Sequence, residues 1–74
     1  MEQVARYRNY LGLTQQELAN ILDISKQSYW NKENGRTPFT DNEKVIIKNL
    51  LLRDFPNISI DEIFFNQMVL QSTE

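Results

Sequence analysis

Apolar residues recur at helical spacing along this 74-residue chain, and helix start and stop signals separate the apolar stretches. Three S/T-x-x-E boxes each place a hydroxyl where it can accept from a first-turn backbone N–H, while the glutamate can accept from the N–H of the capping residue. These boxes are Thr14–Glu17, Thr40–Glu43 and Ser59–Glu62. Two glycines and two prolines lie between the stretches, as is typical of helix ends: Gly12, Gly35, Pro38 and Pro56. The signals predict helices over residues 2–11, 14–22, 26–34, 41–54 and 59–65.

The apolar positions of these helices define the expected core. They are Val4, Tyr7, Leu11, Leu18, Ala19, Leu22, Ile24, Tyr29, Ile46, Ile47, Leu50, Leu51, Ile60, Ile63, Phe64 and Phe65. Val45 and Leu52 fall outside the apolar stripe of the helix over 41–54. Either that helix is buried nearly all round, or its second face meets another chain.

The pattern therefore predicts an all-α fold, with one domain over residues 1–66 and a C-terminal tail over residues 67–74. Within that tail, residues 67–70 are the one candidate strand. The residues that we expect at an interface with a second copy are Val45, Leu52, Met68, Val69 and Leu70.

Composition narrows the possible functions. The chain has no cysteine and no histidine, which excludes disulfides and the usual zinc sites. No apolar run approaches the roughly 18 residues that span a bilayer, and the first residues lack the apolar core of a signal peptide. We expect a protein of the reducing cytoplasm with no metal, cofactor, small-molecule ligand or membrane partner. Enzymatic activity is not expected, because the chain also lacks a glycine-rich phosphate loop.

Residues 13–35 contain the most informative pattern, two short predicted helices joined by a tight turn. The second helix carries Lys26, Gln27, Trp30 and Asn31 on its expected outer face. A rigid helix pair that presents long polar side chains is suited to contacting base edges in a major groove. The net charge of −2 has the wrong sign for DNA, although residues 1–40 hold five cations and four anions, and the negative excess lies in residues 41–74.

The sequence resembles the phage Cro and repressor family of helix-turn-helix regulators, the xenobiotic-response-element type, over about residues 4–64. The matching residues are Arg8, Gly12, Leu13, Thr14, Gln15, Glu17, Leu18, Ala19, Leu22, Ile24, Ser25, Tyr29, Glu33, Asn34, Gly35, Pro38, Ile60, Asp61, Glu62 and Ile63. The likeness is greatest to small Cro-like proteins of phages and integrated elements of Gram-positive bacteria. It implies a compact five-helix lambda-repressor-like domain that binds double-stranded DNA as a homodimer, at the bacterial nucleoid.

The resemblance also implies roles for particular residues. Those matched to base-reading positions are Lys26, Gln27, Trp30 and Asn31, and those matched to phosphate-contacting positions are Gln15, Ser25, Asn34, Arg36 and Thr37. Lysine suits guanine O6 or N7, whereas glutamine and asparagine suit adenine N6 and N7. In the family, the arginine and glutamate at the positions of Arg8 and Glu33 form an internal ion pair with a structural role.

Plainer interpretations stand beside these roles. The polar residues of the third helix could be an ordinary solvated face, and Ser25 and Asn34 could serve only to begin and end that helix. An outward tryptophan must contact something: a thymine methyl, a sugar, a neighbouring helix, a protein partner or the chain's own loop over residues 36–39. Two departures from the family pattern are Asp23, which replaces the usual turn glycine, and Lys32, which replaces a large apolar residue and is a further candidate for a phosphate contact.

Two hypotheses follow for the function. The first is a sequence-specific DNA-binding transcription regulator. The second is an antirepressor-like interaction module that keeps this fold but binds a co-encoded repressor protein, which the acidic balance and the spare apolar residues of the fourth helix favour.

Overall fold

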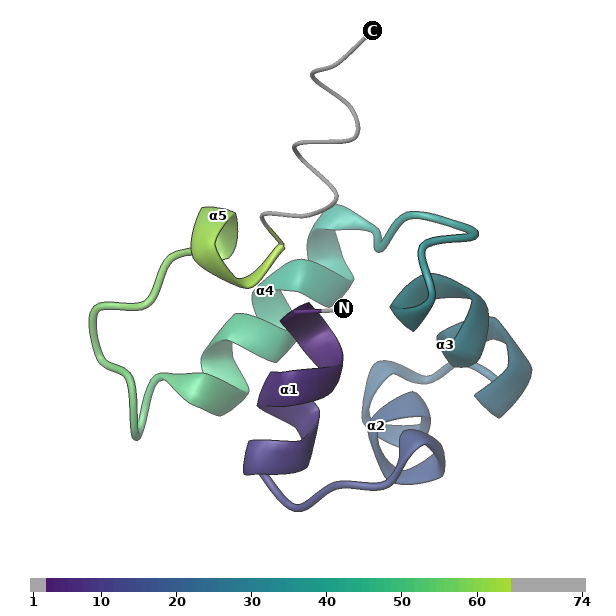
Figure 1. Cartoon of the computed structure of the whole chain (residues 1–74), viewed down its shortest axis with the longest axis horizontal. Helices are drawn as coiled ribbons and strands as arrows, with labels where there is room; N and C mark the ends of the chain where they lie inside the picture. Colours follow the sequence, from purple (N-terminus) through teal and green to yellow (C-terminus); the bar gives the residue numbers. More distant parts are fainter. Residues whose placement is uncertain (1–2, 65–74) are drawn as a thin grey trace, which may run out of the picture.

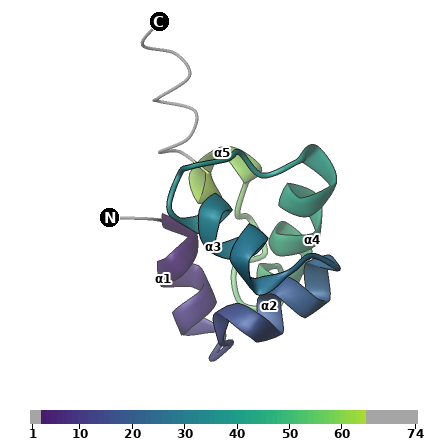
Figure 2. The same ribbon diagram turned by 90° about the vertical axis from the view of Figure 1, so that its right-hand side faces the viewer.

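The computed structural model describes residues 3–64, and this part of the chain folds into five helices without a strand. The helices are α1 (Gln3–Tyr10), α2 (Gln15–Leu22), α3 (Lys26–Glu33), α4 (Asp41–Leu51) and α5 (Ile60–Ile63). Helices α2 and α3 lie together at one end of the molecule and α5 lies at the other (Figure 1). When that first end faces the viewer, α3 stands between α1 and α4 (Figure 2). The predicted all-α class is confirmed for the described residues.

All three predicted capping boxes form. Ahead of α2, Thr14 Oγ1 accepts from the Glu17 N–H at 3.0 Å, and Glu17 Oε1 accepts from the Thr14 N–H at 2.8 Å. The same reciprocal pair precedes α4 and α5. Because the hydroxyl residue of each box is a cap in extended conformation, α2 and α5 each begin one residue later than predicted.

Asp23 ends α2 in the left-handed conformation, with φ at +61°. The Asp23 N–H donates to the Asn20 carbonyl at 3.1 Å, and the Ile24 N–H donates to the Ala19 carbonyl at 3.0 Å. These two bonds close a Schellman turn, in which glycine is the commonest left-handed residue and aspartate is tolerated at some cost. Asp23 stands where the family that the sequence resembles has glycine, but the connection between α2 and α3 is still a tight turn of three residues.

Four helices end before their predicted ends. Helices α1 and α3 each end one residue early, at Tyr10 and Glu33, and the two larger differences are in α4 and α5. Helix α4 ends at Leu51 rather than at residue 54, and the Asp54 and Phe55 N–H groups both return to the Leu51 carbonyl. Pro56 restricts Phe55 to extended conformations, so the helix cannot continue through it. Helix α5 is a single turn that ends at Ile63. Phe65, the candidate strand over residues 67–70 and the tail over residues 67–74 lie outside the described residues.

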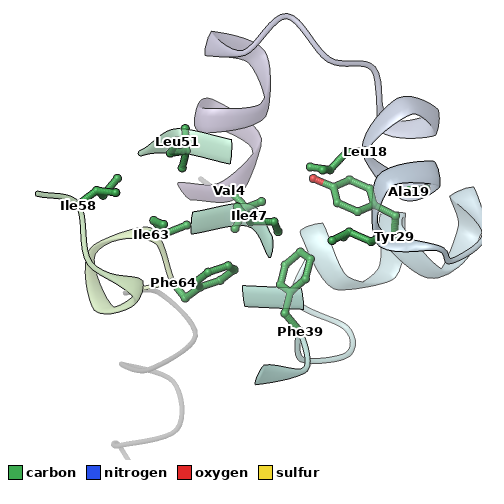
Figure 3. Close-up of a cluster of buried hydrophobic side chains, with 11 residues drawn as sticks. Val4, Leu18, Ala19, Tyr29, Phe39, Ile47, Leu51, Ile58, Ile63 and Phe64 are labelled. Atoms are coloured by element: carbon green, nitrogen blue, oxygen red, sulfur yellow. The ribbon is translucent and has the colours of Figure 1, made fainter. Parts of the chain in front are cut away.

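The core joins side chains from all five helices (Figure 3). Its buried hydrophobic members are Val4, Leu18, Ala19, Leu22, Tyr29, Phe39, Ile47, Leu51, Ile58, Ile63 and Phe64. Phe39 was not predicted, because it lies in the loop before α4, where no helical period marks it. Its ring lies between those of Tyr29 and Phe64, with centroid distances of 6.0 and 5.3 Å. These edge-to-face ring contacts link α3 to the end of α5.

Helix α4 is not buried all round within the described part of the chain. Ile47 and Leu51 are buried and Leu52 is half-buried, but Val45 is 44% exposed. Of the two interpretations of this helix, burial on every side is therefore wrong, and contact with another chain stays a prediction.

Candidate nucleic-acid interface

Helix α3 has one face in the core and one face toward solvent. Tyr29 and Glu33, four residues apart, are buried with exposed fractions of 0% and 5%. Lys26 and Gln27 are exposed in the first turn, and Trp30 is half-buried beside them. The helix is thus anchored at Tyr29 and Glu33 while Lys26 and Gln27 project to solvent at its start, an arrangement that suits a groove-reading helix.

The first turn of α3 begins at a capped end. Ser25 Oγ accepts from the Ser28 N–H at 3.0 Å, so the predicted cap is present. Gln27 Nε2 donates to Asn31 Oδ1 at 3.3 Å, one turn along the helix. This bond orients both amides on the same face, with the Gln27 oxygen and the Asn31 amide group still able to bond a ligand.

The chain after α3 folds back over the end of the helix. The Arg36 N–H donates to the Asn31 carbonyl at 2.8 Å, and Asn34 Nδ2 donates to the Trp30 carbonyl at 2.9 Å. This path places the Arg36 guanidinium over the Trp30 ring, 5.1 Å from its centroid. Among the contacts considered for Trp30, the structure shows the one with its own loop, and the cation–π interaction fixes the ring.

An ion-pair network fastens the buried face of α3 to α1 and α2. Arg8 Nε lies 2.7 Å from Glu33 Oε2, so the ion pair expected from the resemblance is present. The same carboxylate accepts from the Tyr29 hydroxyl at 2.6 Å and from Gln15 Nε2 at 2.8 Å. Arg8 Nη1 also donates to the Leu13 carbonyl at 2.8 Å, next to the start of α2.

The ion-pair network uses one of the side-chain donors of Gln15, the residue that was expected to contact a phosphate. Its amide nitrogen donates to Glu33, so the side chain supports α3 from α2. The backbone N–H of Gln15, in the first turn of α2, and the second amide hydrogen are the donors that could serve its predicted phosphate contact.

Lys32 fastens the opposite side of α3 to α4, which the sequence did not predict. Lys32 Nζ lies 2.6 Å from Glu43 Oε1, and the two side chains are 13% and 8% exposed. The Lys32 ammonium, which was also a candidate for a phosphate contact, is therefore paired inside the protein. Two features of the sequence could have indicated this ion pair: Glu43 was expected to cap α4, and Lys32 stands where the family that the sequence resembles has an apolar side chain.

The remaining predicted site residues lie after α3, on α4 or in the C-terminal tail. Asn34, Arg36 and Thr37 are exposed at the end of α3 and in the following loop. Val45 lies on α4 and Leu52 directly follows it, whereas Met68, Val69 and Leu70 lie outside the described residues. No group of three or more potential metal-ligating side chains occurs in residues 3–64, and no helix in that range is long and apolar enough to cross a bilayer.

No protein-family model, no curated protein and no solved structure matches this chain.

The ion pairs make both buried glutamates stronger acids than usual. Burial raises the pKa of Glu33, but hydrogen bonds from Arg8, Tyr29 and Gln15 outweigh it, and the pKa lies below its ordinary value of 4.5. Burial also raises the pKa of Glu43, and hydrogen bonds from Lys32 and from the Thr40 N–H again leave it lowered. The bond to Glu33 raises the pKa of Arg8, and burial together with the bond to Glu33 raises that of Tyr29.

We expect this protein to lose stability in acid. A lowered folded-state pKa means that the unfolded chain binds the proton more tightly, so the stabilisation is complete above the ordinary pKa of 4.5 and is lost as the pH falls through the folded-state values. Thermal unfolding should give a nearly constant Tm between about pH 8 and 6 and a falling Tm below about pH 5. Glu33→Gln should unfold at a lower temperature near neutrality but with a shallower acid loss. An equally steep acid loss in that variant would contradict the assignment to Glu33.

Proposed function

We propose that this protein is a sequence-specific DNA-binding transcription regulator of the Cro and repressor type. Helices α2 and α3 would form the helix-turn-helix unit of a lambda-repressor-like domain, with α3 in the major groove. The observation that supports this proposal most strongly is how α3 is attached to the rest of the protein. Buried ion pairs fasten its final turn to α1 and α4, while Lys26 and Gln27 project from its first turn.

The side chains around α3 match the two kinds of contact that DNA offers. Lys26 can donate to an acceptor on a base edge, and Gln27 and Asn31 suit the donor and acceptor of adenine. Phosphate contacts would come from both sides of the helix, through Gln15, Ser25, Asn34, Arg36 and Thr37. Because few cations lie near this surface, affinity should fall only moderately with added salt.

A homodimer would place two copies of α3 in successive major grooves about 34 Å apart. Val45 and Leu52 are the described residues that we propose for the contact between copies. Val45 is the more accessible of the two, since it is 44% exposed on α4.

Selection from a pool of random DNA duplexes at about 50 mM salt tests the proposal. We expect enrichment of an inverted repeat, and a gel shift in which Gln27→Ala binds that site about tenfold more weakly, the loss expected for a good base contact. Gln16→Ala is the matched control, because Gln16 is exposed on α2 and bonds Asn20 as Gln27 bonds Asn31, at 2.9 Å. It should bind like the unaltered protein. An enriched site without an inverted repeat would contradict the proposed homodimer but not the proposed sequence-specific binding.

The antirepressor-like function is the second candidate. A net charge of −2 and two exposed apolar side chains, Ile21 and Val45, favour a protein partner. If no duplex is enriched, and the purified repressor encoded beside this protein forms a stable complex with it, the second candidate replaces the first.

A further inference from the structure

A shallow hollow of about 440 Å³ lies on the solvent face of α3, and Lys26, Gln27 and Trp30 line it. These residues lie on one helix face, since Trp30 follows Gln27 by three positions and Lys26 by four. The hollow therefore has one broad apolar wall, the indole, beside two long polar side chains.

The apolar wall is held in a fixed position. The Arg36 guanidinium lies over the Trp30 ring at 5.1 Å, and the Arg36 and Thr37 N–H groups both donate to the Asn31 carbonyl and so hold the loop backbone that carries Arg36. A fixed ring loses little conformational freedom when a ligand group packs against it. It can therefore distinguish ligands that differ by a single methyl group.

The polar side of the hollow offers hydrogen-bond donors. Lys26 has no ion-pair partner among residues 3–64, and Gln27 Nε2, which gives one hydrogen to Asn31, keeps a second. The group that fits here has an apolar projection beside a hydrogen-bond acceptor. In the major groove only thymine presents this combination, through its 5-methyl group and O4.

On the basis of the proposed function, we propose that this hollow receives a thymine. Trp30 is the specificity-determining residue that contacts the 5-methyl group, and Lys26 donates to O4 of the same base. Guanine and adenine have no methyl group for the indole, and cytosine has a donor where thymine has O4.

Replacing each thymine of a selected site in turn by deoxyuridine tests the methyl contact, because this change removes only the methyl group. We expect one position in each half-site at which deoxyuridine weakens binding about fourfold, the change for exposing one buried methyl. This ratio should fall to about one in Trp30→Ala and persist in Tyr10→Ala, which removes an exposed aromatic side chain from α1. If Trp30→Ala does not fold, Trp30→Phe takes its place in the test. It keeps an aromatic wall and should therefore retain part of the ratio.

Two results overturn this inference while leaving the proposed function intact. One is an enriched site at which no thymine is sensitive to the loss of its methyl group. The other is a deoxyuridine effect that is unchanged in Trp30→Ala and Trp30→Phe. A pool in which no sequence is enriched overturns the proposed function and the thymine contact together.

The contact of Lys26 with O4 has its own measurement. 5-Methylcytosine, paired with guanine, keeps the methyl group but replaces O4 by an amino donor, so the unaltered protein should bind it more weakly than thymine at the sensitive position. Lys26→Met should discriminate less between these two bases while retaining the deoxyuridine effect. Equal discrimination by Lys26→Met would remove Lys26 from the inference.

Discussion

Arg8→Ala is expected to lower the free energy of unfolding by about 3–5 kcal/mol, the cost of leaving a buried charge without its partner. The Glu33 carboxylate is 5% exposed and would keep only its bonds from Tyr29 and Gln15. The change also removes the bond from Arg8 to the Leu13 carbonyl, which orients the start of α2. For a domain of this size, such a loss is a large part of the total stability.

Urea unfolding measures this effect, with Arg6→Ala as the control. Arg6 is exposed on the same helix, so its removal should change the unfolding free energy by no more than about 0.5 kcal/mol. If Arg8→Ala does not fold at all, Arg8→Lys should still show an intermediate loss, because lysine keeps the charge but not the guanidinium geometry. Equal stability of Arg8→Ala and Arg6→Ala would falsify a structural role for the network.

Glu43→Ala is expected to cost about 3 kcal/mol, because it removes a helix cap and the partner of a nearly buried lysine at once. Lys32 and Glu43 join at 2.6 Å, and Glu43 also closes the capping box of α4. The variant should therefore loosen α3 from α4 as well as weaken the start of α4.

Glu17→Ala separates these two contributions. Glu17 closes the same kind of box ahead of α2 but is exposed and has no ion-pair partner among residues 3–64. Its loss should cost about 1 kcal/mol or less, the range for a cap alone. Thermal unfolding of both variants gives the difference. If the two losses are equal, the ion pair contributes nothing measurable beyond the cap.

Most of the helical arrangement could be predicted because its signals are local. The capping boxes, the left-handed residue at the end of α2 and the apolar spacing each involve residues within about five positions of one another. The errors occurred where such signals are absent. Phe39 is a core residue in a loop without periodicity, and the apolar spacing continued past Leu51, where the structure ends α4.

The candidate site divides in the same way. Helical spacing placed Lys26 and Gln27 on the exposed face of α3 and Tyr29 on the buried face, and the structure agrees. The chemistry of the neighbouring side chains depended on longer-range contacts. Arg36 covers Trp30 because the chain folds back after α3, and Lys32 turns inward because the start of α4 brings a carboxylate to it.

The local order of residues was thus sufficient for the all-α class, for most helix starts and for the exposed face of α3, because hydrogen bonds within one or two turns decide them. The inward position of Lys32, the covered ring of Trp30 and the edge-to-face ring contacts of Phe39 required the packed molecule. Each depends on how separate elements meet, and the energy of such a contact exists only once both partners have been brought together.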